Sequence, residues 1–158
     1  MCHIHTKSID KLALKKSGIP GGGTGLFTLK EINPGDDVCV YEGEEMKASE
    51  FAKTDSDYGA ALNKSTTIDA SSTQSTIGRY INHCRDENKK EKHCDGNNTK
   101  WVIDHRSRTI KVRATKVIPK NKEVFISYGQ TYWKQKPKKR KKRPESNVVR
   151  NTAIKRRR

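Results

Sequence analysis

The chain has 158 residues, 31% of them hydrophobic, and a formal net charge of +16 at pH 7. This length fits one domain with a tail and excludes two full hydrophobic cores. No apolar run approaches the ~20 residues of a membrane span, and the N-terminal residues lack an apolar signal core, so we expect a soluble intracellular protein.

The positive charge is concentrated at the C-terminus. Residues 134–158 contain 13 Lys and Arg and one acidic residue, whereas residues 1–133 carry a net charge of only +4. The first part therefore has the charge balance of an ordinary folding unit. The tail has almost nothing to bury and is expected to be disordered when free.

Residues 17–46 are predicted to form three short strands, because their apolar runs are separated by turns that contain Gly and Pro. Residues 47–62 are the best helical stretch, with apolar side chains available for one face. Residues 65–71 and 77–83 are predicted to be short strands. The polar residues 88–100 are predicted to be a loop.

A hairpin is predicted for residues 101–118, where apolar residues alternate on either side of a turn at residues 106–108. Residues 120–122 form another predicted turn, and a strand follows from residue 123 to Gly129. Because helix is scarce and short strands alternate with turns, the sequence predicts a mainly β domain of several small sheets.

We expect the cysteines to be thiols, because disulfides are rare in intracellular proteins. They are Cys2, Cys39, Cys84 and Cys94. Cys39 lies in the apolar run VCVY and is predicted to be a small core residue.

A glycine-rich stretch, GGGTGLF, spans residues 21–27. Glycines let a backbone approach a ligand closely. The stretch lacks the Gly-Lys-Ser/Thr of a phosphate loop, and no long helix follows it. On its own, a plain hairpin turn is the favoured interpretation.

Four nitrogen and sulfur side chains have the right number for a zinc site, but their spacing is irregular and contains no C-x₂₋₄-C pair. They are Cys84, His93, Cys94 and His105. Unliganded loop residues are favoured, and no metal is expected. A hydrolase is also disfavoured, because Ser127 does not lie in a nucleophile elbow.

Two further motifs are open to both a structural and a functional interpretation. GRYINHC, residues 78–84, places Asn82 and His83 between an apolar run and a polar loop. FISYGQTYW, residues 125–133, combines a strand, Tyr128, a glycine turn and two more aromatic residues. The second motif is either aromatic core at the edge of the domain or a tyrosine hydroxyl aimed into a pocket with an aromatic lid.

Taken in chain order, four segments resemble the motifs of SET-domain protein lysine methyltransferases. The family's G-x-G turn is matched by GTGLF, and its Tyr-x-Gly-Glu strand by VYEGEEM. Its Ile-Asp-Ala and Arg-Phe-x-Asn-His-Ser pair is matched by TIDAS and GRYINHC. Its closing Ile-x-x-Gly-Glu-Glu-Leu-x-x-x-Tyr-Gly is matched by IPKNKEVFISYG. The ISYGxxYW ending is similar to small stand-alone SET proteins of large viruses.

This resemblance covers residues 18–133 and implies the SET fold (β-clip). Residues 1–17 would be an N-terminal extension, and residues 134–158 a disordered basic tail. The SET fold consists of several small curved sheets with few short helices. In its C-terminal pseudoknot, the last strand tucks beneath the loop after Asn82 and His83. The cofactor S-adenosylmethionine and the substrate would enter from opposite faces and meet in a narrow channel.

The resemblance also implies which residues form the site. Cofactor contacts are implied for Gly23, Thr24, Gly25, Asn82, His83, Tyr128 and Trp133. The glycine turn would contact the cofactor through its backbone. Asn82 and His83 would bind its amino-acid and adenine ends, and Trp133 would cover the adenine. The catalytic tyrosine at the inner end of the channel is matched by Tyr128, and a tyrosine of the channel wall by Tyr41.

Methyl transfer from a sulfonium to an amine is an in-line displacement that needs no metal. The lysine must be neutral, although its pKa in water is about 10.4. A carboxylate beside the amine would favour the ammonium form. A tyrosine hydroxyl and carbonyl oxygens can instead align the amine and polarise the methyl group, while a narrow channel orients it and excludes water.

The chain departs from the family pattern at several positions. Cys84 replaces the usual serine, and residues 85–97 replace a short link, with Asn98 as the candidate for the family asparagine. Ser127 replaces the Asp that often precedes the catalytic tyrosine. Ile126, two residues before that tyrosine, favours more than one methyl group because its side chain is small and apolar.

The basic run PKKRKKR, residues 137–143, resembles a nuclear localisation signal. It would also bind DNA phosphates without sequence preference. Together with the resemblance to lysine methyltransferases, these features predict a nuclear enzyme acting on a histone tail of the nucleosome. The similarity to small stand-alone SET proteins is compatible with a homodimer. The alternatives are a catalytically weak SET-like module that binds chromatin through its tail, and a zinc-dependent nucleic-acid binder.

Overall fold

The computed structural model describes residues 9–72 and 76–135, and the chain divides into two units, Met1–Tyr128 and Gly129–Arg158. We call the described residues of the first unit the body. Its strands are β1 (Leu12–Lys16), β2 (Thr24–Thr28), β3 (Asp37–Tyr41), β4 (Glu44–Lys47), β5 (Gly59–Ala61), β6 (Thr66–Asp69), β7 (Thr99–Asp104) and β8 (Thr109–Ala114).

Helices are short throughout the part of the chain that the structure describes. The body contains α1 (Ala48–Phe51), α2 (Asp86–Lys90) and the 3-10 helices η1 (Ile9–Lys11) and η2 (Ile77–Tyr80), and the second unit contains α3 (Gln130–Gln135). Within residues 9–72 and 76–135, no helix has the length and apolar character to cross a membrane.

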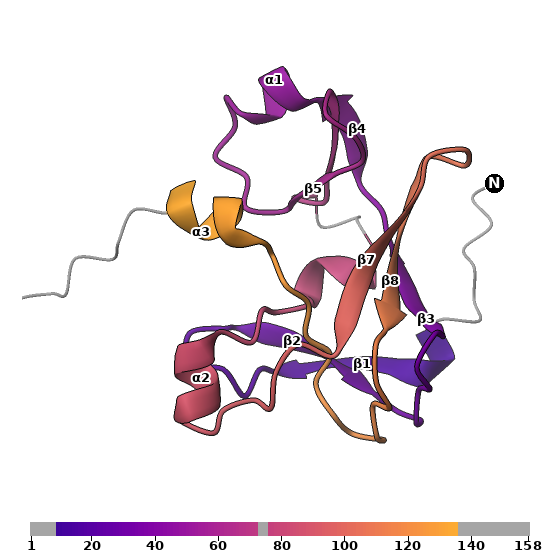
Figure 1. Cartoon of the computed structure of the whole chain (residues 1–158), viewed down its shortest axis with the longest axis vertical. Helices are drawn as coiled ribbons and strands as arrows, with labels where there is room; N and C mark the ends of the chain where they lie inside the picture. The colour runs from indigo at the N-terminus through magenta and orange to yellow at the C-terminus, as the bar shows by residue number, and fades with distance from the viewer. Residues whose placement is uncertain (1–8, 73–75, 136–158) are drawn as a thin grey trace, which may run out of the picture. The chain divides into compact units, whose positions relative to one another are not determined.

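The strands form small antiparallel sheets. β1 pairs with β2, a second sheet has the order β3–β8–β7, and a third has the order β4–β6–β5. In Figure 1 the β4–β5 region with α1 lies at one end of the body, the β1–β2 hairpin with α2 lies at the other, and the β7–β8 hairpin lies between them. The predicted mainly β architecture of several small sheets is confirmed.

The β7–β8 hairpin forms where the sequence predicts it. Alternate residues of β8 are buried, as the period of a half-buried strand requires. At the turn, a carboxylate oxygen of Asp104 accepts hydrogen bonds from the backbone N–H of Arg106 (2.9 Å) and Ser107 (3.1 Å). This local bonding is the usual way in which Asp stabilises a turn.

Two hydrophobic clusters connect these sheets. One joins β1, β2, β3 and β8 with the end of the body, and its buried members are Leu12, Leu26, Ile32, Val38, Cys39, Ile81, Val112, Ala114, Ile118, Val124 and Ile126. The other joins the β4–β6–β5 sheet to β3 and β8, and its buried members are Tyr41, Ala60, Leu62, Ile68, Ala70 and Ile110.

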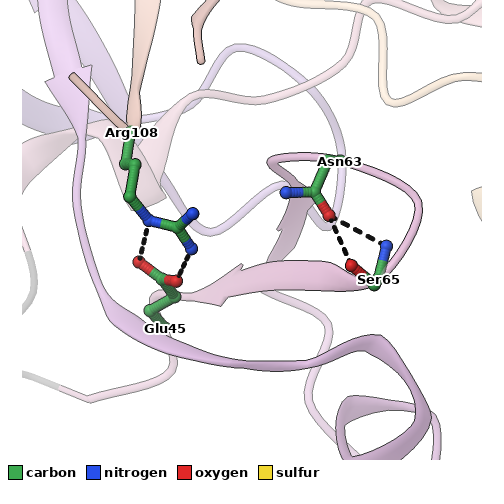
Figure 2. Close-up of polar contacts among 4 residues, drawn as sticks. All are labelled: Glu45, Asn63, Ser65 and Arg108. Atoms are coloured by element: carbon green, nitrogen blue, oxygen red, sulfur yellow. Dashed lines mark hydrogen bonds and ion pairs between the residues drawn. The ribbon is translucent and has the colours of Figure 1, made fainter. Parts of the chain in front are cut away.

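An exposed ion pair also connects two sheets. Arg108, at the β7–β8 turn, places its guanidinium against the carboxylate of Glu45 on β4 (Figure 2). In the same view, the side-chain oxygen of Asn63 accepts hydrogen bonds from the N–H and hydroxyl of Ser65, which closes the β5–β6 turn. Because both members are exposed, the ion pair contributes no more than about 1 kcal/mol.

The predicted helix over residues 47–62 is wrong for most of its length. Only α1 is helical, and the chain then turns into β5. The hydroxyl of Thr54 donates to the carbonyl of Phe51 (2.8 Å) and accepts from the N–H of Ser56 (3.3 Å). Such local bonds compete with the helix, and the residues of β5 beyond them find partners in β6.

Three further predictions of local structure are also wrong. Residues 123–129, predicted as a strand, form only isolated bridges. Residues 77–80, predicted as part of a strand, form the 3-10 helix η2. The predicted loop over residues 88–100 overlaps α2 at its start and β7 at its end. Acidic residues in the first turn of α2 and lysines in its last turn suit the helix dipole.

The cysteine prediction is wrong for one pair. Cys84 and Cys94 form a disulfide with a Cα–Cα distance of 6.0 Å. The bond closes a loop of residues 85–93 within the segment of residues 85–97, which we call the insertion. The bonded cysteines pack with Phe125 and Ile19. Among the described residues Cys39 is a buried free thiol, as predicted. Both bonded sulfurs are therefore unavailable as zinc thiolates.

Candidate active site

The last residues of the body thread between two other segments. We call residues 123–128 the closing segment. The N–H of Ile126 donates to the carbonyl of Asn82 (2.9 Å), and the carbonyl of Phe125 accepts from the N–H of Thr99 (3.1 Å). The closing segment thus lies between Asn82 and the start of β7, which is the predicted pseudoknot arrangement.

Asn98 holds this arrangement through its side chain. Its carboxamide oxygen accepts from the N–H of Phe125 (2.8 Å), and its amide donates to the carbonyl of Glu123 (2.9 Å). Asn98 is buried, so the two bonds are shielded from water and replace two rungs of a strand ladder. This is the residue that the family resemblance identifies as the candidate asparagine after the insertion.

Asn82 joins the closing segment to the glycine-rich stretch. Its side-chain amide donates to the carbonyl of Thr24 and to the carboxylate of Glu123, both at 3.2 Å. Of the residues predicted to contact the cofactor, Asn82 and Thr24 are therefore brought together directly.

Glu123 is a buried carboxylate at this junction, and no role was predicted for it from the sequence. Besides Asn82, it accepts hydrogen bonds from the hydroxyl of Ser17 (2.6 Å) and the N–H of Gly18 (2.9 Å). A buried carboxylate needs such donors to offset its lost hydration. Its place in the family's closing motif was the available sequence signal.

The glycine-rich stretch forms a tight connection between β1 and β2. The N–H of Ser17 donates to the carbonyl of Gly23 (2.8 Å), and Gly23 has a φ of 63°, which favours glycine. Gly25 is buried against Glu123, and a Cβ on Gly25 would overlap that carboxylate. Gly23 is therefore favoured by its backbone conformation, and Gly25 by the lack of space for a side chain beside Glu123.

An open pocket lies against this connection. It is lined by Lys16, Ser17, Gly18, Ile19, Pro20, Gly21, Gly23 and Thr24. The lining combines backbone polar groups, one ammonium and small side chains, a donor set that suits the carboxylate and polar substituents of an amino-acid-like ligand. These residues fit S-adenosylmethionine.

His83 and Tyr128 are also brought together. The backbone N–H of Tyr128 donates to Nδ1 of His83 (3.3 Å), and the two rings meet edge to face with centroids 5.4 Å apart. The pKa of His83 is lowered, chiefly by burial and further by Arg85, while Asp86 opposes the shift. The neutral ring that accepts at Nδ1 is therefore the favoured form near neutral pH.

The hydroxyl groups of both predicted channel tyrosines donate to backbone carbonyls. Tyr128 donates to Ile81 and Tyr41 donates to Tyr58, each at 2.6 Å. These bonds fix each hydroxyl proton and leave the phenolic lone pairs as acceptors. The ring of Tyr41 also meets that of Trp101, another residue for which no role was predicted from the sequence.

Trp133 lies in α3, which belongs to the second unit, where its ring meets that of Tyr132 edge to face at 5.0 Å. Its predicted place over the adenine stays a prediction. The predicted nuclear localisation signal lies outside the described residues, as does Cys2.

The sequence profile of the SET domain matches residues 23–129, which is more than half of the chain. The search of curated protein sequences found no match to this chain. The match spans the Asn82–Thr24 junction, the His83–Tyr128 pair and the closing segment. The chain therefore belongs to the SET-domain family, whose enzymes are protein lysine methyltransferases that use S-adenosylmethionine.

Proposed function

We propose that this protein is an S-adenosylmethionine-dependent protein lysine N-methyltransferase that acts on a histone tail in chromatin. The observation that carries the proposal is the anchoring of Tyr128, whose N–H is bonded to His83 and whose hydroxyl is bonded to Ile81. Tyr128 thus has a fixed position at the end of the closing segment, next to the segment that carries Asn82.

In this proposal the open pocket and Asn82 hold the cofactor, with Gly23 and Gly25 allowing its close approach to the backbone. When bound, S-adenosylmethionine supplies an electrophilic methyl group. Glu123 does not contact the reacting atoms; it holds Ser17 and Asn82 in place through its carboxylate.

Tyr128 orients the target amine. Its hydroxyl proton is already donated to Ile81, so the oxygen presents lone pairs to the amine and to the methyl hydrogens. The lysine must lose a proton before attack, because its pKa in water is about 10.4. A tyrosine oxygen that is not ionised avoids the stabilisation of ammonium that a carboxylate would cause.

The histone substrate and the nuclear location are proposed from the charge of the tail. Residues 134–158 hold 13 of the 34 Lys and Arg residues. Such a segment suits both nuclear import and non-specific contact with nucleosomal DNA. The same contact would keep the enzyme near histone tails and raise their effective concentration.

The first test is methyl transfer from labelled S-adenosylmethionine to intact nucleosomes and to free core histones. We expect label on one histone and its loss in Tyr128→Phe, with cofactor binding retained in calorimetry. Tyr58→Phe is the matched control, since the described contacts of Tyr58 use its backbone and its ring and not its hydroxyl.

Three other outcomes would change the conclusion. Transfer that survives in Tyr128→Phe would remove Tyr128 from the catalytic role. Cofactor binding without transfer to any histone would favour the chromatin-binding module or a non-histone substrate. The chromatin-binding module is supported by the disulfide-closed insertion directly after His83, where the family has a short link. Absence of cofactor binding would overturn the proposal.

A further inference from the structure

Trp101 connects two parts of the body that carry the predicted channel tyrosines. It lies on β7 and is partly buried, packing against both hydrophobic clusters. Its ring meets that of Tyr41 edge to face, with centroids 5.2 Å apart and planes at 88°. Its indole N–H donates to the carbonyl of Ser127 at 2.9 Å. Ser127 immediately precedes Tyr128.

The register of the sheet explains the ring contact. β3 and β7 lie on either side of β8, with Tyr41 opposite Ile110 and Trp101 opposite Val112. Ile110 and Val112 are two residues apart, so Tyr41 and Trp101 lie on the same face of the sheet. Their rings therefore meet across β8, and a shift of one ring changes its packing against the other.

The hydrogen bond from Trp101 to Ser127 extends the pairing of β7 with the closing segment, with a side chain as the donor. That pairing ends at the bridge between Thr99 and Ile126, where the Thr99 N–H donates to Phe125. One step further, at Ser127, the donor is the indole of Trp101. A side chain thus replaces a backbone rung and sets the distance between β7 and the residue before Tyr128.

We propose that Trp101 is a positioning residue for methyl transfer, which fixes the ring of Tyr41 and the backbone that carries Tyr128 at the same time. The inference rests on the proposed function. Trp101 does not contact the reacting atoms; it acts through the two tyrosines. A small displacement of such groups lowers the rate of an oriented reaction by up to about 100-fold.

The test separates the ring from the N–H. Trp101→Phe keeps an aromatic ring beside Tyr41 and removes the donor to Ser127, whereas Trp101→Leu removes both. The matched control is Ile103→Ala, on the same strand and the same face but 38% exposed. Each variant is measured for kcat, for KM of cofactor and of histone peptide, and for the ratio of mono-, di- and trimethylated product.

We expect Trp101→Phe to lower kcat about tenfold or more and to change the product ratio, with KM for the cofactor within about twofold of the unchanged protein. Trp101→Leu should lower kcat further, and Ile103→Ala should change none of these. In the unchanged protein the indole N–H resonance of Trp101 should lie downfield of that of a free indole in NMR, because its proton is hydrogen-bonded to Ser127.

Normal kcat and product ratio in Trp101→Phe would overturn the inference. A parallel loss of kcat, cofactor affinity and unfolding free energy would reduce Trp101 to a core residue and overturn it too. An indole N–H chemical shift equal to that of a free indole would overturn the inference in the unchanged protein, without need of a variant that folds. No transfer by the unchanged protein would overturn the proposed function itself, and the inference with it.

Discussion

At the scale of single residues, the site depends on a buried carboxylate that is paired with several donors. Glu123 is buried and receives hydrogen bonds from Ser17, Gly18 and Asn82. These donors come from the glycine-rich connection and from the segment that follows η2. One side chain thus links two segments that are 106 and 41 residues away from it along the chain.

Glu123→Gln should therefore weaken both the fold and the cofactor site. The amide keeps the shape but turns one acceptor into a donor, which faces either Ser17 and Asn82 or the N–H of Gly18. An unmatched buried polar group costs about 1–3 kcal/mol. We expect a loss of that size in the free energy of unfolding by urea, with weaker cofactor binding in calorimetry. Glu45→Gln, which breaks an exposed pair, should cost below about 1 kcal/mol. Equal effects of the two changes would contradict the role given to Glu123.

His83 gives the site a pH dependence. Its pKa in the folded protein is lowered by burial first and by Arg85 second, so the unfolded chain, with a pKa of about 6.5, binds the proton more readily. The stability that this shift of the His83 pKa contributes is fully present above about pH 6.5 and is lost as the pH falls through the folded pKa. Protonation also removes the Nδ1 acceptor of the Tyr128 N–H.

The measurement is urea unfolding and cofactor affinity between about pH 5 and pH 8. His83→Gln should flatten the part of the stability profile between the folded and unfolded pKa values. His105→Gln, at an exposed turn position, should leave the pH dependence of the stability unchanged. A profile unchanged by His83→Gln would show that other groups set the acid sensitivity.

At the scale of elements, the closing segment is held by a mixture of isolated backbone bonds and side-chain bonds. Single bridges link it to β2, to Asn82 and to Thr99, and Asn98 supplies two further hydrogen bonds. The insertion leads from Cys84 to Asn98, so its conformation decides whether Asn98 can reach the closing segment.

The Cys84–Cys94 disulfide should stabilise this element. Cross-links around short loops contribute on the order of 2–4 kcal/mol, mainly by restricting the unfolded chain. We expect reduction, or Cys94→Ser, to lower the free energy of unfolding by about that amount and to weaken cofactor binding, because Cys84 follows His83 directly.

Alkylation and mass spectrometry would check the bond itself. Cys84 and Cys94 should take up label only after reduction. Cys39 should stay unlabelled in the folded protein, because burial raises its pKa to about 12 and covers its sulfur. Labelling of Cys94 in the folded protein without a reductant would contradict the disulfide.

At the scale of the whole molecule, charge is distributed very unevenly along the chain. Residues 1–133 have a net charge of +4 out of the total of +16. Residues 1–133 and residues 134–158 therefore have separate proposed roles, chemistry in the first and nuclear location and DNA contact in the second.

Replacing the Lys and Arg residues of 138–143 by Gln should lower the affinity for a DNA duplex and flatten its salt dependence. The log–log slope should fall by about 0.9 for each DNA phosphate that the tail no longer neutralises. Transfer to a free histone peptide should be unchanged, whereas transfer to nucleosomes should fall. Anisotropy titrations at several salt concentrations measure the slope. Retained DNA affinity would remove the tail from this role.

The sequence predicted most strands, and the failures have a common physical reason. The β7–β8 hairpin was predictable because its alternation and its turn are local. The structure of residues 47–62 was not predictable in this way, because pairing of β5 with β6 overrides their helical spacing. The pairing of Cys84 with Cys94 depends on α2 and the course of the insertion, which spacing alone does not reveal.

The sequence by itself determined the family, the mainly β class and the positions of the site motifs, because short motifs in a fixed order carry that information. Only the tertiary structure decided which distant groups meet. The burial of Glu123 against Ser17 and Asn82, and the contact of Trp101 with both Tyr41 and Ser127, arise from threading the closing segment between Asn82 and β7. Such contacts are set by the packing of segments far apart in the chain, which no local pattern of residues specifies.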